Sequence, residues 1–157
     1  MVTPGSQYTM VAWSSHLPGS VGDRMHLTLG FRAYDLTTRA LVIAAAGTGP
    51  EGADLMEVAG PHPLFMTAED DAGVERAVAA GAALVRVPEP TAGVRRRCAA
   101  AGVALVEGSL FLDVTGADCP TAAVAVGVIR GARLVRTTDA RGARRVCDVL
   151  AAVLEAR

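Results

Sequence analysis

The chain has 157 residues, of which 51% are hydrophobic and 4% aromatic, and a formal net charge of −1. This length is enough for one domain with its own core, and the near-neutral charge gives no reason to expect a nucleic-acid or membrane partner. No apolar run approaches the length of a bilayer span, and the first residues lack the basic start of a signal peptide. We therefore expect a cytoplasmic protein.

An N-terminal arm and a single domain are predicted. Residues 1–23 are rich in Pro, Gly and Ser and are expected to form a flexible arm, in which the stretch YTMVAW at 8–13 could add a strand or act as a docking segment. Residues 24–157 are expected to form one α/β domain. Within it, the run at 25–31 predicts a strand and the segment 35–46 predicts a helix.

A short motif then recurs four times. The stretches GADLMEV, GAALVRV, GVALVEG and GARLVRT begin at Gly52, Gly81, Gly102 and Gly131. Glycine tolerates the left-handed conformation of a helix C-cap, and the apolar run after it is typical of a strand buried on both faces. A further strand is predicted at 63–68, with 109–114 as another candidate.

Helical patterns fill the intervals between these strands. They cover 67–80, with Thr67 as the expected N-cap, 91–101, 120–130, and a final helix capped by Asp139. The predicted inward stripe of the final helix is Val146, Val149, Leu150, Val153 and Leu154. Six or seven strands alternating with about five helices predict a mainly parallel α/β fold: a shortened or incomplete TIM-type (β/α) barrel, or a small doubly wound sheet.

The motif places a charge five positions after each glycine. These charges are Glu57, Arg86, Glu107 and Arg136. Each is expected near the carboxyl end of its strand, where parallel α/β folds carry their sites, so the four could meet at one mouth. They could neutralise one another as a ring of ion pairs, or one arginine could stay free for an anionic ligand.

The sequence favours Arg136 as the anion-binding residue. Thr137, Thr138 and Asp139 follow it and lead into the N-terminus of the last helix, which attracts phosphate or carboxylate groups. Three arginines in the first turns of that helix oppose its dipole, and an anion would relieve this; a solvated basic face is the alternative. They are Arg141, Arg144 and Arg145.

Known catalytic and metal-binding motifs are absent from the sequence. Cys98, Cys119 and Cys147 lack metal-ligand spacing, and we find no Walker loop, GxGxxG or nucleophile elbow. The chain also contains no lysine and no asparagine. We therefore predict no metal, no cofactor and no catalytic residue of a standard type.

Three stretches resemble the dihydropteroate synthase (pterin-binding) family. AAAGTGPEGADLMEVAG is similar to a family helix ending in Ala-Ala-Gly that leads into an apolar strand. MTAEDDAGVERAVAAGAALVRV is similar to the third and fourth strands of the family. The closing DCPTAAVAVGVIRGARLVRTTDARGARRVCDVLAAVLEA looks like its last helix, strand and helix. The resemblance covers about 110 residues, discontinuously.

The resemblance implies a (β/α)8 barrel that joins a pterin pyrophosphate to p-aminobenzoate, with magnesium, in folate biosynthesis. Arg136 matches the family's pyrophosphate-binding Arg and Asp139 its Asp, but Thr138 stands where a His belongs. Thr67 replaces the pterin-binding Asp, and Arg86 lies where the family has Asn-Asp. The Ser-Arg-Lys segment and much of the sixth and seventh βα units have no counterpart.

Three functions follow as hypotheses. The first is a shortened family member, a pseudoenzyme without synthase activity, that holds a small phosphorylated or carboxylated molecule or a partner protein. The second is an active enzyme, either one of diverged activity or a dihydropteroate synthase-type transferase that another chain could complete, with Glu57 and Glu107 as acid and base. The third is a structural partner of a full-length synthase-like protein. Because an incomplete barrel leaves unpaired strand edges, a homodimer is the default expectation.

Overall fold

The structure, a computed structural model, describes residues 25–29, 32–106 and 110–157. The predicted arm at 1–23 and Glu107 lie outside these residues. The described part contains nine strands and four helices. The strands are β1 (His26–Leu29), β2 (Arg32–Asp35), β3 (Leu41–Ala44), β4 (Leu55–Met56), β5 (Phe65–Thr67), β6 (Leu84–Arg86), β7 (Ala104–Val106), β8 (Phe111–Asp113) and β9 (Leu134–Thr137); the helices are α1 (Asp71–Ala79), α2 (Ala92–Ala101), α3 (Pro120–Ile129) and α4 (Ala140–Glu155).

Seven parallel strands follow one another around an incomplete barrel. One sheet has the order β5-β6-β7 and the other the order β4-β3-β9-β8. A single parallel bridge between Met56 and Leu64 links the two sheets. On the other side no pairing joins β7 to β8 within the described residues, so the barrel has an open seam there. The predicted shortened TIM-type barrel is confirmed.

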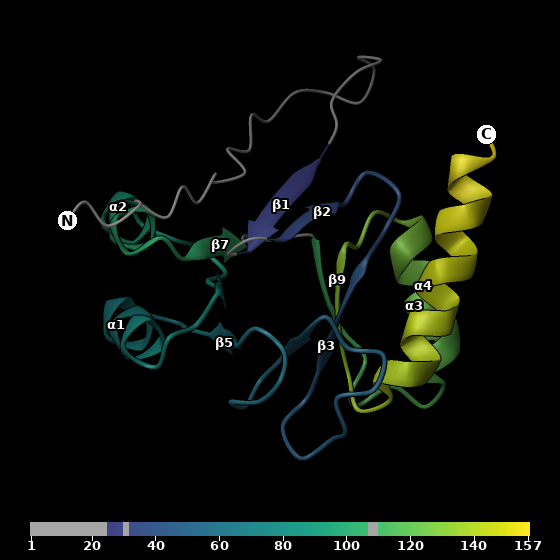
Figure 1. Cartoon of the computed structure of the whole chain (residues 1–157), viewed down its shortest axis with the longest axis horizontal. Coiled ribbons are helices and arrows are strands. Elements are labelled where there is room, and N and C mark those ends of the chain that lie inside the picture. The colour runs from purple at the N-terminus through teal and green to yellow at the C-terminus, as the bar shows by residue number, and fades with distance from the viewer. Residues whose placement is uncertain (1–24, 30–31, 107–109) are drawn as a thin grey trace.

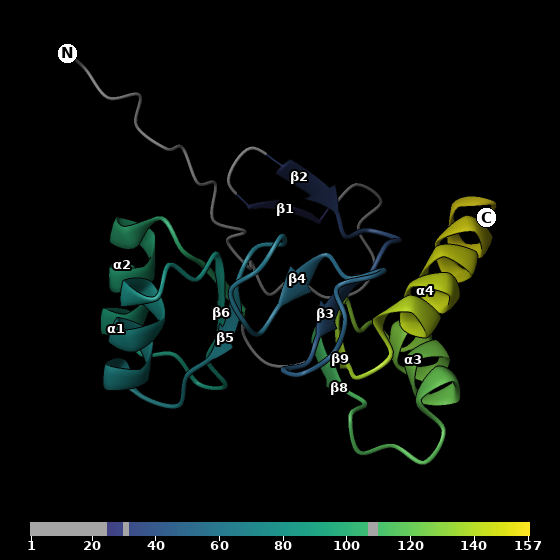
Figure 2. The same cartoon turned by 60° about the horizontal axis from the view of Figure 1, so that its bottom comes forward.

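Two pairs of helices cover the two sheets from outside. Figure 2 shows α1 and α2 beside β5 and β6, and α3 and α4 on the opposite side of the molecule beside β3, β8 and β9. The chain passes from β3 to β4 through a turn without a helix. Helices α1, α2 and α3 precede the glycine-headed strands β6, β7 and β9, and α4 follows β9, so only part of the helical layer of a complete barrel is present.

The β1–β2 hairpin closes the amino end of the barrel. It is antiparallel, and its Leu27 and Leu29, with Leu36 after β2, pack into the barrel interior. The hairpin contacts β7 through β1, and Figure 1 shows β1 reaching that strand. The other buried residues of this barrel-interior cluster are Leu41, Ile43, Leu55, Phe65, Leu84, Val106 and Leu134. Since one end is filled, the carboxyl ends of the strands remain as the place for a site.

The predicted helix at 35–46 is wrong. Asp35 ends β2, and Leu41–Ala44 forms β3, the strand between β4 and β9. All four residues of β3 are buried, because the hairpin side packs on one face and α4 on the other. A run of four apolar residues fits such a strand, whereas a helix would expose some of them.

Two helix details also differ from the sequence prediction. Asp70, not Thr67, caps α1 by accepting a hydrogen bond from the Gly73 N–H. In α4 the buried stripe consists of small residues, while Val149 and Val153 are 63% and 48% exposed. The buried members are Ala140, Ala143, Cys147 and Ala151. Val146 and Leu150 of the predicted stripe do pack, half-buried, against the core, so the prediction is wrong for Val149 and Val153. Small side chains let α4 approach α3 and β3 closely.

Candidate functional site

The charged residues of three of the four glycine-headed motifs lie at the carboxyl rim of the barrel, as predicted. Leu55, Leu84 and Leu134 all belong to the barrel-interior cluster. Side chains alternate along a strand, so the residues two positions later point to the same side of the sheet. Glu57, Arg86 and Arg136 therefore lie at the inner rim: Glu57 follows β4, Arg86 ends β6, and Arg136 is the last residue but one of β9.

The β7 motif does not keep this register. Ala104 pairs with Leu84 and Val106 with Arg86, so Val106 faces the interior while Leu105 packs on the outer cluster under α1 and α2. Glu107, predicted at the rim, lies outside the described residues. The fourth rim charge is Asp113 of β8, which pairs in register with Arg136.

Asp113 was missed because β8 has no leading glycine. A pattern that would have predicted it is an apolar residue followed two positions later by a charged one. Phe111 and Asp113 have this spacing on β8, as Leu134 and Arg136 have it on β9. Phe111 also packs on the barrel-interior cluster.

Arg136 is bound by two carboxylates and is not free, contrary to the preferred reading of the sequence. Its Nε donates to Glu57 Oε1 and its Nη2 to Glu57 Oε2 at 3.0 Å. Its Nη1 donates to Asp113 Oδ2 at 3.0 Å and to the Thr115 hydroxyl at 3.2 Å. The backbone N–H of Ala46 donates to Glu57 as well. This ion cluster satisfies most of the guanidinium donors within the protein.

The cluster shifts the acidity of its members. Burial alone would raise the pKa of Glu57, but hydrogen bonds from Arg136 and from the Ala46 N–H outweigh it and lower that pKa below its ordinary 4.5. Burial likewise opposes ionisation of Asp113, yet hydrogen bonds from Thr115 and the charge of Arg136 lower its pKa below 3.8. The bond to Glu57 in turn raises the pKa of Arg136. All three groups are charged at neutral pH.

Arg86 is the rim arginine whose donors the described residues leave unused. Its guanidinium carbon lies 4.4 Å from the centroid of the Phe111 ring, and Phe111 stacks on Phe65 at 5.7 Å. The Arg86 Nε is buried and has no hydrogen-bond partner, and no ion pair joins Arg86 to another residue in the described part of the chain. A buried donor left unsatisfied costs about 1–3 kcal/mol. Thr67 lies beside Arg86 on β5.

The start of α4 is already occupied by side chains of the protein. Asp139 accepts a hydrogen bond from the Gly142 N–H at 2.9 Å, which confirms it as the cap, and Thr138 is exposed. Arg144 binds Asp54 and Asp148, and Arg141 lies 3.6 Å from Glu51. The positive charge of Arg141 and Arg144 near the start of α4, which an anion was expected to balance, is therefore largely balanced by carboxylates of the protein itself.

Metal binding finds no support in the donor set. The described residues contain no group of three or more His, Cys, Asp or Glu side chains that could hold a metal ion. The two rim carboxylates, Glu57 and Asp113, are both engaged by Arg136. The magnesium that the resemblance implies therefore does not fit these residues, since Mg²⁺ relies on available carboxylate oxygens. None of the described helices is long and apolar enough to cross a membrane.

Comparison with known proteins gives a result at the level of structure only. No protein-family model matches the sequence, and a search of curated proteins gives no match. A dihydropteroate synthase from Yersinia pestis, solved with a pterine-sulfa conjugate, aligns with a TM-score of 0.59 and 15% identity over 85% of this chain and 100% of that one. The chain has the dihydropteroate synthase fold.

Other enzymes of this fold give the same result. The 7,8-dihydropteroate synthase from Vibrio fischeri aligns with a TM-score of 0.59 at 11% identity, over 83% of this chain and 98% of that one. The Xanthomonas albilineans synthase with 4-aminobenzoic acid aligns at 0.57 and 14% identity, over 87% and 100%. The family-like stretch AAAGTGPEG is the end of β3 and a turn here, not the end of a helix.

Proposed function

We propose that this protein has the dihydropteroate synthase fold without synthase activity and binds a small phosphorylated or carboxylated molecule at the carboxyl rim of its barrel. The observation that carries this is the Arg86 guanidinium, which lies over Phe111 with a buried Nε unpaired within the described residues. An anion at this place would accept from the unused donors. A planar guanidinium held against a ring presents its N–H groups as a fork for such an anion.

The loss of synthase activity rests on two features. Thr67 replaces the pterin-binding Asp of the resembled family, so a carboxylate partner for a heterocycle edge is missing at the end of β5. Arg136, which matches the family's pyrophosphate-binding Arg, is held by Glu57 and Asp113. Binding of a substrate anion to Arg136 would have to displace these carboxylates. In this proposal Thr138 and Asp139 contribute the polar surroundings of the rim.

The test is a thermal-unfolding titration with pyrophosphate, p-aminobenzoate and a pterin. A ligand present at 100 times its Kd stabilises the folded state by about 2.7 kcal/mol, which raises the melting temperature by several degrees. We expect at least one anion to give such a rise and Arg86→Gln to abolish it. Arg96→Gln, which changes an exposed arginine on α2, is the matched control and should keep the rise. A rise that survives in Arg86→Gln contradicts the proposal.

A second candidate function is synthase activity itself. It is favoured by the alignment of 85% of this chain with an enzyme of that activity at a TM-score of 0.59. Incubation with the pterin pyrophosphate and p-aminobenzoate, alone and with a full-length synthase-like protein, tests it. Product formation that depends on this chain would replace the first proposal.

The open seam supports an association with another protein chain. β7 and β8 each present one edge that is unpaired within the described residues, and unpaired edges favour pairing with a second chain. We take a homodimer as the default and a full-length synthase-like protein as the alternative partner. Mass measurement in solution, alone and after mixing, separates the two from a monomer.

A further inference from the structure

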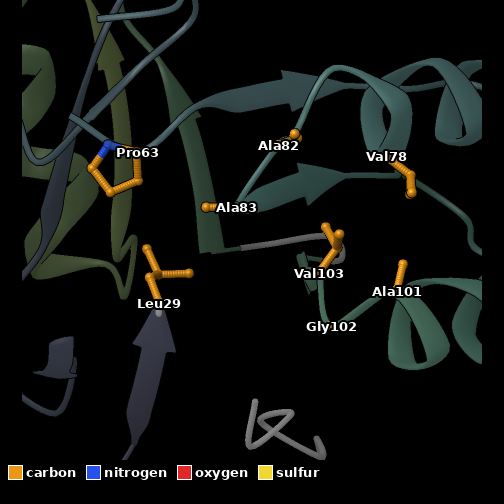
Figure 3. Close-up of a pocket in the computed structure, with 9 residues that line it drawn as sticks. Leu29, Pro63, Val78, Ala82, Ala83, Ala101, Gly102 and Val103 are labelled. Carbon is orange, nitrogen blue, oxygen red and sulfur yellow. The ribbon is translucent and has the colours of Figure 1, made fainter. Parts of the chain in front are cut away.

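A hollow of about 330 Å³ lies at the amino ends of β5, β6 and β7, while the charged rim lies at their carboxyl ends. Figure 3 shows Leu29 of β1 and Pro63 on one side of it and Val78 of α1 and Ala101 of α2 on the other. The side chains found to line it carry no polar atom, so the polar part of its wall belongs to the main chain. Its volume is at the lower end of the roughly 300–1,000 Å³ typical of pockets that hold ligands.

The main chain around the hollow presents hydrogen-bond acceptors. The N–H groups of residues 81–83, after α1, and of residues 102–103, after α2, all donate to carbonyl oxygens of the protein. No hydrogen bond found among the described residues ends on the carbonyl oxygens of Gly81, Ala82, Ala101 or Gly102. The negative ends of two helix dipoles also meet here, because α1 and α2 both end at the hollow. Such a place favours a cation that carries several N–H donors.

The end of α3 has the same main-chain arrangement as the end of α1. The Gly131 N–H donates to the Val128 carbonyl at 3.1 Å, and the Gly81 N–H donates to the Val78 carbonyl at 3.0 Å. In both motifs the next N–H donates to the carbonyl five residues earlier. The motifs that follow, GARLVR at 131–136 and GAALVR at 81–86, differ at one position. The two helix ends can therefore be compared residue by residue.

The position that differs is Arg133, whose guanidinium binds the end of α3. Its Nη1 donates to the carbonyl of Val128 at 3.0 Å and to that of Ala132 at 2.8 Å, and its other nitrogens donate to carbonyls that follow β2. All of these acceptors are main-chain oxygens. The residues equivalent to Val128 and Ala132 are Val78 and Ala82, and both line the hollow.

Ala83 stands at the position of Arg133 in the α1 motif and also lines the hollow. The end of α1 therefore has the acceptors that hold a guanidinium at the end of α3, but its own motif supplies no guanidinium. The side chain that fills the space beside α3 is replaced here by a methyl group, and this explains why the place is hollow.

We propose that the hollow binds a small alkylguanidinium compound. Its charged head donates to carbonyl oxygens at the ends of α1 and α2, as Arg133 does at the end of α3, and its alkyl part packs against the side chains of Leu29 and Val103. Helix C-termini favour positive charge, and a guanidinium offers five N–H donors in a planar fork. The proposal does not depend on the anion site, because the two places lie at opposite ends of the strands.

The test is a titration of the full-length protein with butylguanidinium chloride, followed by thermal unfolding and by amide NMR. A ligand at about 100 times its Kd should raise the melting temperature by several degrees. We expect a saturable rise, and amide shifts at residues 81–83 and 101–103 that follow the same curve. Butylurea has nearly the same shape without the charge, and it should give neither effect, as should sodium chloride at the same concentration.

Variants at Ala83 test the comparison with Arg133. Ala83→Arg supplies the guanidinium from the chain itself, so it should lose the response to butylguanidinium and melt at a higher temperature than Ala83→Met, which has a side chain of similar reach without donors. Ala100→Arg adds an arginine at an exposed position of α2 that does not line the hollow, and it should keep the response. If Ala83→Arg does not fold, Ala101→Met, which fills the hollow from its exposed wall, should lose the response instead.

Three results overturn the proposal. The first is the absence of a saturable rise in the wild type, and the second is an equal rise with butylurea. The third is a response that survives in Ala83→Arg, or in Ala101→Met, because the cation then binds elsewhere. An Ala83→Met variant that melts as high as Ala83→Arg also contradicts it, since filling the space would then matter and the donors would not.

Discussion

Glu57 and Arg136 bind each other across a strand that carries neither of them. Glu57 follows β4, Arg136 lies on β9, and β3 runs between the two. Beyond the end of β3 the chain continues with Ala45 and Ala46, and the Ala46 N–H also donates to Glu57. One ion pair thereby ties three strand ends together at the rim.

Removing this pair should cost more than removing a surface pair. We expect Glu57→Gln to lower the free energy of unfolding by about 1–3 kcal/mol, because a half-buried charged hydrogen bond is lost. Combination with Arg136→Met should show a coupling energy of about 1 kcal/mol or more. The measurement is denaturant unfolding of the single and double variants.

The Glu51–Arg141 pair is the matched control for this cycle. Its side chains are 78% and 67% exposed and 3.6 Å apart. Glu51→Gln should change stability by less than about 0.5 kcal/mol. Equal losses of unfolding free energy at the two pairs would show that the rim ion pair stabilises the fold no more than an exposed pair does.

The ion cluster of Glu57, Asp113 and Arg136 predicts that the free energy of unfolding decreases at acidic pH. The folded-state pKa values of Glu57 and Asp113 lie below their ordinary 4.5 and 3.8. A lowered carboxyl pKa contributes stability that is fully present above the unfolded-state value and is lost as pH falls through the folded-state value. Unfolding free energy should therefore be steady from neutral pH to about pH 5 and fall below about 4.5. The slope below that pH should be smaller in Glu57→Gln; an unchanged slope refutes the assignment.

The sequence predicted the fold better than it predicted the pairing of its charges. Glycine-headed apolar runs mark β4, β6, β7 and β9, because helix capping and strand burial act locally. The position of Arg136 at the rim follows from the same local pattern. The partners of Arg136 could not be predicted in this way. Which arginine, Arg136 or Arg86, pairs with the rim carboxylates depends on which strands lie beside β9. Asp113 is brought there by a strand without the motif.

The helix predicted at 35–46 failed for a related reason. A short run such as Leu41–Ala44 fits a buried strand or a buried helix equally well in isolation. Only the neighbours β4 and β9, which come later in the chain, decide between them. In the same way, the capping of α1 by Asp70 and not Thr67 is set by where β5 ends.

Two motif glycines should differ in their tolerance of alanine. Gly52 has φ +83°, and a Cβ there would lie 2.9 Å from the Arg141 Cα, so Gly52→Ala brings backbone strain and a backbone clash. Gly81 has φ +78° but a Cβ there meets nothing within 4 Å. We expect Gly81→Ala to cost about 1 kcal/mol from the left-handed conformation alone, and Gly52→Ala to cost clearly more. Thermal unfolding of both variants measures the difference, and equal costs contradict the close approach of α4 to Gly52.

Arg133 should control how tightly the hairpin is held. Its Nε donates to the Leu36 carbonyl at 2.8 Å, and its Nη2 donates to that of Thr37 at 3.3 Å. Arg133→Met should destabilise the protein by about 2 kcal/mol and speed amide hydrogen exchange in β1 and β2. Arg130→Met, at an exposed position at the end of α3, is the control and should do neither. Unchanged exchange in the hairpin of Arg133→Met would contradict this role.

The single bridge between the two sheets has a consequence for the order in which the chain folds. The sheet β5-β6-β7 with α1 and α2 is built from one continuous stretch, so its contacts close short loops. The other sheet needs Leu41 to meet Leu134, 93 positions away, before β3 can pair with β9. Loop closure over such a separation costs more entropy and slows folding. The transition state should therefore contain the local unit, while the β3–β9 pairing and the rim ion pair that depends on it form late.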